Sequence, residues 1–357
     1  MDTVHGGEIL TGHWRAGRPV TPYQSQEQRP NGGAFSANSL AFLNLGSLHR
    51  VGFSTEFRGP QFGRAGVECG RSGAFYAGFP EARLETLPNF EAMMSASLAG
   101  RPLSRVNVLI YICGFNNSCE GASKMLGQML ALSSYPSDFL PIVFAWPGGN
   151  IPSYFQAKAV CESKRLEDEF VTLVSQLQAS GLVSRIDVIG HSQGCRFLAH
   201  CFAKPGMRSL NVNHLVLISP EADLEDFERD GETICGSIHG TVTIYAHPGD
   251  MALFWAQIFN SLGEGTFKRS VGRRSEPIVS RSSGKALDMD IIDTTSLASN
   301  VEELHHSFFY LSREMLWDIQ SLLVEGHRAK HRPLLIERGD DQCYNFCSVP
   351  PAITSIF

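Results

Sequence analysis

The chain has 357 residues, of which 43% are hydrophobic and 18% charged, and its formal net charge is −6 at pH 7. This composition is typical of a globular protein, and the slightly acidic balance argues against a general nucleic-acid-binding protein. No run approaches the roughly 18 consecutive apolar residues of a membrane span, and the first residues lack the basic start and apolar core of a secretory signal.

The part of the chain before residue 105 contains few clear secondary-structure patterns. Residues 1–48 are rich in Gly, Pro, Ser, Asn and Gln and show little periodicity, which predicts an irregular or partly disordered N-terminal arm. Residues 49–104 mix aromatic residues with glycines. We expect short strands at the edge of a sheet in this segment.

Residues 105–327 contain strands that are apolar throughout and that alternate with helical patterns. This alternation predicts an α/β protein with a mostly parallel sheet and helices on both faces, which is the layout of the α/β-hydrolase fold. Together with the edge strands these residues form one predicted domain, 49–327, and the proline-containing residues 328–357 form a C-terminal tail. The predicted strands are 106–112, 142–146, 185–189, 214–219, 241–246 and 289–292, and the predicted helices are 122–132, 154–180, 195–203 and 308–323.

A Gly-His-Ser-Gln-Gly sequence at 190–194 lies between the predicted strand 185–189 and the predicted helix 195–203. Strand, Gly-x-Ser-x-Gly and helix form the context of a nucleophile elbow, in which a sharp turn holds the serine above the sheet edge. The N–H groups and the positive dipole end of the following helix face the same point. We therefore predict that Ser192 is a nucleophile; the alternative is a glycine-rich structural turn.

Two aspartates compete for the carboxylate that would orient a catalytic base. A serine hydroxyl needs a histidine to take its proton and a carboxylate to hold that histidine, in the chain order Ser, Asp or Glu, His. Asp250 follows the second strand after the elbow, at a Pro-Gly turn, and Asp223 follows the first. The strand count favours Asp250, with Asp223 as the alternative acid. Either aspartate could instead be a helix N-cap or a turn residue.

The predicted base is one of two adjacent histidines, His305 and His306, which follow the last short strand and precede the last helix. Their position alone does not choose between them. His247 precedes Asp250 and so breaks the chain order. His191 lies inside the elbow, where its side chain points away from the serine oxygen.

Two backbone N–H groups are needed to bind the oxyanion that forms during acyl transfer. One is predicted to come from Gln193, the residue after the nucleophile, and the other from Phe115, in the loop after strand 106–112. Gly114 allows this loop to turn its amides inward. The alternative is a plain strand-to-helix turn.

Six segments resemble, in the right order, motifs of a little-characterised, bacterial-type branch of α/β-hydrolase esterases and lipases that is classed as a domain of unknown function. The resemblance runs from about residue 104 to residue 320 and implies an α/β-hydrolase fold and ester cleavage. It also favours Asp250 as the acid and selects His306 over His305. The similar segments are 112–118 (Ile-Cys-Gly-Phe-Asn-Asn-Ser), 143–147 (Val-Phe-Ala-Trp-Pro), 190–194, 219–223 (Ser-Pro-Glu-Ala-Asp), 249–253 (Gly-Asp-Met-Ala-Leu) and 306–309 (His-Ser-Phe-Phe).

One position departs from the family pattern, because Cys113 stands where the family has a histidine that shapes the oxyanion loop. The complete Ser, Asp and His set still predicts a serine hydrolase that cleaves a small-molecule carboxylic ester through an acyl-enzyme, without a cofactor. Two alternatives stay open. One is a thioesterase, amidase or acyltransferase with the same triad, and the other is a non-catalytic relative that binds a ligand or a protein.

The nine cysteines show no spacing typical of a disulfide framework. Cys343 and Cys347 have no Cys or His pair beside them at zinc spacing, so we predict no metal site. Reduced thiols are typical of the cytoplasm, which is the expected location.

Overall fold

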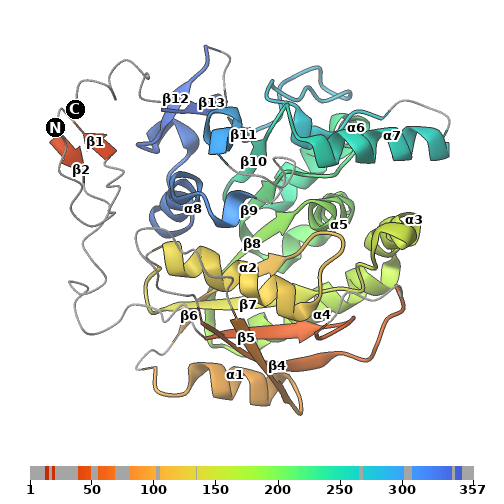
Figure 1. The fold of residues 1–357 in the computed structure, drawn as a ribbon, viewed down its shortest axis with the longest axis vertical. Coiled ribbons are helices and arrows are strands. Elements are labelled where there is room, and N and C mark those ends of the chain that lie inside the picture. Colours follow the sequence, from red (N-terminus) through yellow and green to blue (C-terminus); the bar gives the residue numbers. More distant parts are fainter. Residues whose placement is uncertain are drawn as a thin grey trace, which may run out of the picture.

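The computed structural model describes residues 13–15, 18–20, 39–49, 55–68, 81–101, 105–133, 135–264, 268–300, 308–339 and 342–347. Strands β1 (His13–Arg15) and β2 (Arg18–Val20) form an antiparallel pair of their own. The other strands of the described residues form one eleven-stranded sheet (Figure 1).

The sheet has the order β12-β13-β11-β10-β9-β8-β6-β7-β3-β4-β5. Neighbouring strands are parallel from β13 to β3, and antiparallel pairs occur only towards the two edges, at β12–β13, β3–β4 and β4–β5. The predicted mostly parallel sheet is therefore confirmed. The strands are β3 (Leu40–Asn44), β4 (Gln61–Glu68), β5 (Glu81–Leu87), β6 (Val106–Ile112), β7 (Phe139–Ala145), β8 (Val183–His191), β9 (Val212–Ile218), β10 (Val242–Ala246), β11 (Met289–Asp293), β12 (Leu335–Glu337) and β13 (Cys343–Phe346).

Helices cover both faces of the sheet. Successive residues of a strand point to opposite sides, and the central strands carry buried side chains on both sides. The Tyr111 hydroxyl on β6 donates to the Met125 sulfur of α2, and its ring lies beside Phe309, which precedes α8. Phe144 on β7 points to the other face and stacks on Phe197 of α5, with ring centroids 6.0 Å apart. The helices are α1 (Phe90–Leu98), α2 (Cys119–Leu132), α3 (Tyr154–Cys161), α4 (Lys164–Ala179), α5 (Gln193–Phe202), α6 (Leu224–Ser237), α7 (Met251–Glu264) and α8 (Arg313–Glu325).

The predicted long helix 154–180 is interrupted and forms α3 and α4 instead. The Ser163 side-chain oxygen accepts a hydrogen bond from the Leu166 backbone N–H (3.3 Å) and so caps the start of α4. A serine at this position satisfies an N–H group that the first helical turn leaves unpaired. Charged residues flank Ser163 on both sides and fit the polar face of one continuous amphipathic helix, so the sequence pattern does not show that a new helix begins here.

Both segments that were predicted to lie outside the domain contribute strands to the sheet. β3 falls within 1–48, and its five residues are all buried between β4 and β7. β12 and β13 fall within 328–357, and β13 pairs in parallel with β11. The sheet therefore extends beyond the predicted boundaries of 49–327 on both sides.

A buried arginine ties the C-terminal strands to the rest of the fold. Arg332, whose side chain is completely buried, donates through Nη1 to Asp318 of α8 at 2.7 Å and to the Tyr245 hydroxyl of β10 at 3.1 Å. Its Nη2 atom donates to Asp290 of β11 at 3.2 Å. Burial raises the pKa of Asp318, although Arg332 and Tyr245 act against this shift. The arginine therefore supplies a countercharge for the buried Asp318, and it shares Asp290 with Arg328, whose Nη2 atom lies 3.0 Å from that carboxylate.

His214 on β9 is expected to make the fold sensitive to acid. It is buried, and its Nδ1 atom accepts a hydrogen bond from the Thr241 backbone N–H (3.1 Å). Burial, followed by the charges of Arg185 and Arg332, lowers the pKa of His214 from 6.5 to about 4. Between these values the unfolded chain binds more protons, so stability falls as the pH decreases from 6.5 to 4. The full effect of such a shift is about 3 kcal/mol.

The variant His214→Asn removes this titration and keeps an acceptor near the position of Nδ1. The free energy of unfolding in urea should be measured between pH 7 and pH 4. The amount by which the wild-type value exceeds that of the variant should decrease as the pH falls. Burial raises the pKa of Asp187 to about 6, and this group acts in the opposite direction in both proteins. The exposed His239→Asn serves as the matched control. A wild-type advantage that stays constant with pH would contradict the assignment.

Candidate active site

Ser192 occupies a sharp turn between β8 and α5 at the carboxyl end of the parallel strands. Its backbone has φ 52° and ψ −120°, a conformation that non-glycine residues rarely adopt. Glycine is required at 194, because an added Cβ there would lie 2.6 Å from the Ile112 carbonyl oxygen. At Gly190 a Cβ would lie 2.6 Å from the Leu198 side chain. The structure therefore has the strand, tight turn and helix of a nucleophile elbow.

Backbone hydrogen bonds hold Ser192 against the loop after β9. Its N–H donates to the Ile218 carbonyl (3.0 Å), and its carbonyl accepts from the N–H groups of Cys195 (2.9 Å) and Glu221 (3.2 Å). Ser219, in the same loop, has φ 44° and is a second residue in the left-handed region. The strained turn is thus supported from the side of β9.

The loop after β6 packs directly on the serine. A Cβ added to Gly114 would lie 2.9 Å from the Cβ of Ser192, so only glycine allows this approach. The Trp146 indole Nε1 donates to the Cys113 carbonyl (2.8 Å) and anchors the loop. Phe115 follows Gly114, and Gln193 follows Ser192. The two residues predicted to supply oxyanion amides therefore lie in segments that the fold brings together.

Cys113 is fully buried at the start of this loop. Burial raises the pKa of its thiol to about 12, so the neutral form dominates near neutral pH. The side chain is therefore a small packing group and not a competing nucleophile. The anchor from Trp146 uses the backbone of Cys113 and does not depend on its side chain.

Asp250 is completely buried at the start of α7, after β10. Its Oδ1 atom accepts a hydrogen bond from the Leu253 N–H (2.8 Å), and its own N–H donates to the His247 carbonyl (2.9 Å). The carboxylate thus takes the position of a helix N-cap. It follows β10, two strands from β8, at the same edge of the sheet as Ser192.

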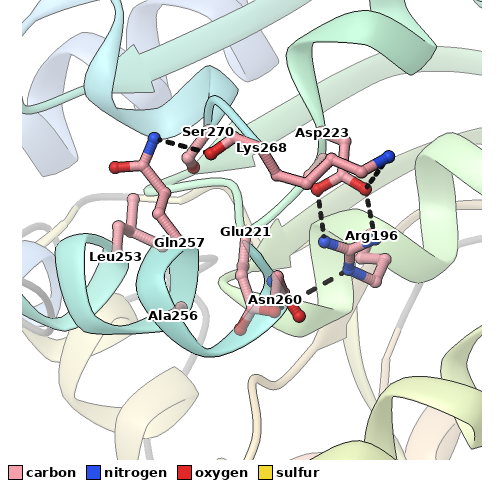
Figure 2. A pocket seen from close by; sticks show the side chains of 10 residues that line it. Arg196, Glu221, Asp223, Leu253, Ala256, Gln257, Asn260, Lys268 and Ser270 are labelled. Carbon is pink, nitrogen blue, oxygen red and sulfur yellow. Dashed lines mark hydrogen bonds and ion pairs between the residues drawn. The ribbon is translucent and has the colours of Figure 1, made fainter. Parts of the chain in front are cut away.

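Asp223, the alternative acid, is engaged by an arginine of the elbow helix. Arg196 Nη2 donates to Asp223 Oδ1 at 2.9 Å and Nη1 to Oδ2 at 3.3 Å, so the contact is two-pronged (Figure 2). Burial opposes ionisation, but the Arg196 charge outweighs it and lowers the pKa of Asp223 below its usual value. Lys268 Nζ lies 3.9 Å from the same carboxylate. Asp223 is therefore an ionised partner in a buried ion pair.

Both candidate bases, His305 and His306, lie outside the described residues. The described chain on either side of them is anchored near the elbow. Thr294 donates from N and Oγ1 to the Ala246 carbonyl at the end of β10 (2.9 and 3.0 Å). The Phe309 ring packs on the His191 ring, with centroids 4.6 Å apart. The His191 ring therefore contacts Phe309, and its Nδ1 atom also lies close to Gly114, where an added Cβ would be 3.1 Å away.

Aromatic side chains border the loop after β6. The Tyr154 ring of α3 lies 5.5 Å from the Phe115 ring and 6.2 Å from the Phe259 ring of α7. Phe155 and Phe259 are about half exposed, at 53% and 48%. An apolar surface therefore lies beside the loop that packs on Ser192.

A small cavity, lined in part by Asp223, lies between α5, α7 and the loop after β9 (Figure 2). Its volume is about 10 Å³, which is room for about one water molecule. The lining includes Arg196, Glu221 and Lys268, so the cavity is polar. Its size excludes an ester substrate.

Sequence reasoning did not single out Arg196, Tyr154 or Glu221 as residues of this site. The Tyr154 hydroxyl donates to Glu221 Oε1 (2.7 Å), and Arg196 is buried although it is charged. One signal was present in the sequence, because Arg196 stands four residues after Ser192, on a predicted helix that is otherwise mostly apolar. A charge at such a position needs a buried partner.

A mostly parallel sheet with helices on both faces, and a serine elbow at the carboxyl end of its strands, define an α/β-hydrolase. Residues 90–325 match the family described as "Alpha/beta hydrolase of unknown function (DUF900)". The chain belongs to this family, and the match covers both Ser192 and Asp250. No curated protein sequence matches the chain.

The chain is distantly similar to several solved structures. Est1E from Butyrivibrio proteoclasticus has 12% identity and a TM-score of 0.38, with 63% of this chain and 91% of that chain covered. An inhibited esterase B from Lactobacillus rhamnosis has 9% identity and a TM-score of 0.36, with 64% and 79% covered. A cutinase-like protein from Cryptococcus sp. has 14% identity and a TM-score of 0.33, with 62% and 94% covered. These distant likenesses concern the fold alone.

Among the helices of the described residues, none combines the length and the hydrophobicity that crossing a membrane requires.

Proposed function

We propose that the protein is a serine hydrolase that cleaves carboxylic esters through an acyl-enzyme. The observation that carries this proposal is the elbow, in which Ser192 adopts φ 52° and packs on Gly114 of the oxyanion loop. A strained serine held between a strand and a helix N-terminus has little purpose as a plain turn, and such strain concentrates at functional sites.

In the proposed reaction, Ser192 Oγ attacks the acyl carbon while His306 takes its proton. The N–H groups of Phe115 and Gln193 stabilise the oxyanion, and the alcohol leaves with the proton that His306 returns. Water then attacks the acyl-enzyme, gives a proton to His306 and releases the acid, and the serine recovers its proton. Asp250 orients the imidazole throughout.

Chain connectivity supports a base from the segment that carries His305 and His306, and the family resemblance selects His306. Phe309 packs on His191, the neighbour of Ser192, and three residues of chain span at most roughly 11 Å. On the other side, Thr294 is bound to the end of β10, the strand that leads to Asp250. The described residues Thr294 and Phe309, on the two sides of this segment, therefore lie at the acid side and at the nucleophile side of the site. The Phe115–Tyr154 surface is suited to an apolar part of the ester.

Labelling with a fluorophosphonate probe tests the proposal. We expect the wild type to be labelled covalently and to hydrolyse p-nitrophenyl acetate, and Ser192→Ala to lose both. The exposed Ser283→Ala is the matched control and should retain both properties. A folded wild type that is neither labelled nor active would instead favour a non-catalytic binding protein. Transfer of the acyl group to an added thiol or alcohol, in preference to water, would favour an acyltransferase.

A further inference from the structure

Arg196 is a buried cation one helical turn after the nucleophile. Its side chain is 4% exposed, yet it belongs to α5, whose first residue directly follows Ser192. A guanidinium in this position is tolerated only when carboxylates and hydrogen bonds replace its water. The carboxylates come from Asp223 in two-pronged contact, from Glu221 with Oε1 3.7 Å from Nε, and from the half-exposed Glu162 at 3.2 Å.

Asp223 and Glu221 lie in the loop after β9, which also binds the backbone of the nucleophile. Ile218 accepts from the Ser192 N–H, and the Glu221 N–H donates to the Ser192 carbonyl. The elbow and this loop are therefore joined at two points, one through backbone bonds at Ser192 and one through the ion pair at Arg196. Both partners contain a residue with positive φ, Ser192 at 52° and Ser219 at 44°. Such conformations persist only when the surroundings hold them firmly.

We propose that Arg196, Glu221 and Asp223 form a clamp that fixes the position of Ser192, so that Asp223 is a positioning residue and not the acid of the triad. This inference rests on the proposed function of Ser192. The two-pronged geometry suits the role, because a planar guanidinium that bonds both carboxylate oxygens fixes orientation as well as distance. The carboxylate of Asp223 is occupied by this contact, whereas Asp250 follows the second strand after the elbow, the position that the strand count favours.

Glu221 extends the clamp to the opposite side of the site. Its Oε1 atom accepts from the Tyr154 hydroxyl (2.7 Å), and Tyr154 packs edge-on against Phe115 with centroids 5.5 Å apart. The same carboxylate lies 3.5 Å from the Gln193 side-chain Nε2 atom. The clamp thus contacts α5 directly and reaches the oxyanion loop through one aromatic ring. Its loss is expected to displace both the nucleophile and the residues beside the oxyanion.

Steady-state kinetics of Asp223→Asn and Arg196→Met test the clamp. We expect each variant to lose about 10- to 100-fold in kcat for p-nitrophenyl acetate with little change in KM, since a displacement of about 1 Å at a reacting group costs this much. Labelling by the fluorophosphonate should slow by the same factor. The double variant should be no slower than the slower single variant, because the contact that Asp223→Asn breaks is already absent in Arg196→Met. Arg196→Lys keeps the positive charge but cannot bond both oxygens of Asp223 with a planar guanidinium. Its kcat should therefore lie between the values of wild type and Arg196→Met.

The pH dependence separates a positioning residue from a triad acid. In Asp250→Asn the inflection of kcat/KM should move to lower pH, because the imidazole loses the carboxylate that favours its charged form. In Asp223→Asn the inflection should stay near its wild-type position. Asp226→Asn, on α6 with a side chain 43% exposed, is the matched control and should behave as wild type.

Amide hydrogen exchange tests the clamp without any turnover. The peptide that covers 190–198 should exchange faster in Asp223→Asn than in wild type or Asp226→Asn. Unchanged exchange together with full activity in Asp223→Asn and Arg196→Met would overturn the clamp. It would also be overturned if Asp223→Asn alone lost roughly 10⁴-fold with a shifted inflection while Arg196→Met stayed active, because that pattern marks a triad acid. Turnover that survives Ser192→Ala would refute the proposed function. Hydrogen exchange does not depend on turnover, so it would still show whether Asp223 and Arg196 hold the segment around Ser192.

Discussion

Replacing His306 with alanine should abolish ester hydrolysis, with kcat falling by about 10⁴- to 10⁶-fold. The loss is this large because no other group would take the proton of Ser192 as it attacks, and a serine hydroxyl without a base is a weak nucleophile. The adjacent His305→Ala should keep most of the activity. Initial rates with p-nitrophenyl acetate, together with the rate of fluorophosphonate labelling, measure both variants.

The two adjacent variants serve as controls for each other, since each removes one imidazole from the same segment. Thermal unfolding shows whether either change alters the fold. Equal loss of activity in both would refute the choice of His306, and a fully active His306→Ala would refute the triad itself. The family resemblance supplied this choice, because position along the chain did not separate the two histidines.

The variant Arg332→Met should destabilise the fold by about 3–5 kcal/mol, which is the usual cost of removing one partner of a buried ion pair. Asp318 and Asp290 would then remain buried without the guanidinium that now contacts both. The free energy of unfolding in urea measures the effect. The matched control is Arg338→Met, from the same segment, whose contact with Asp293 is at the surface and should contribute less than about 1 kcal/mol.

The loss in the free energy of unfolding caused by Arg332→Met, here called the deficit, should depend on pH in a defined direction. Burial already raises the pKa of Asp318, and loss of the arginine removes a charge that opposes this shift. The folded variant would then hold a proton that the unfolded chain releases, so its stability falls as the pH rises. The deficit relative to wild type should therefore be smaller near pH 5 than near pH 8. A deficit that is equal at both pH values, or as small as that of Arg338→Met, would show that Arg332 does not serve as the countercharge.

The parallel core could be predicted because most of its strands contain a short continuous run of apolar residues. β7 is an example, since all seven of its residues are buried, and a continuous apolar run identifies such a strand without knowledge of its neighbours. β12 and β13 could not be found in this way. They are short and carry polar residues, and β13 pairs with β11, a strand about fifty residues earlier in the chain.

The elbow could likewise be predicted, because its signal is local: two glycines, a serine and the change from strand to helix. The role of Asp223 could not. The sequence favours Asp250 over Asp223 through the strand count and the family resemblance, but it does not show what Asp223 does instead. The partner that engages Asp223 lies 27 residues earlier, at Arg196. Such an ion pair between distant segments forms only in the folded chain, and the hydrophobic periodicity of the sequence does not indicate it.

The position of β13 in the sheet has a consequence for the way the chain is made. β11 lies between β10 and β13, and β13 follows it in sequence by about fifty residues, with α8 in between. Until those residues leave the ribosome, one side of β11, which is mostly buried in the folded sheet, has its N–H and C=O groups open to pairing with another chain. A nascent chain or a fragment that stops before residue 343 is therefore prone to aggregation. In the complete sheet, by contrast, the outermost strand on that side is the three-residue β12, which ends in Glu337 and is followed by Arg338. A short, charged edge of this kind discourages further strand addition.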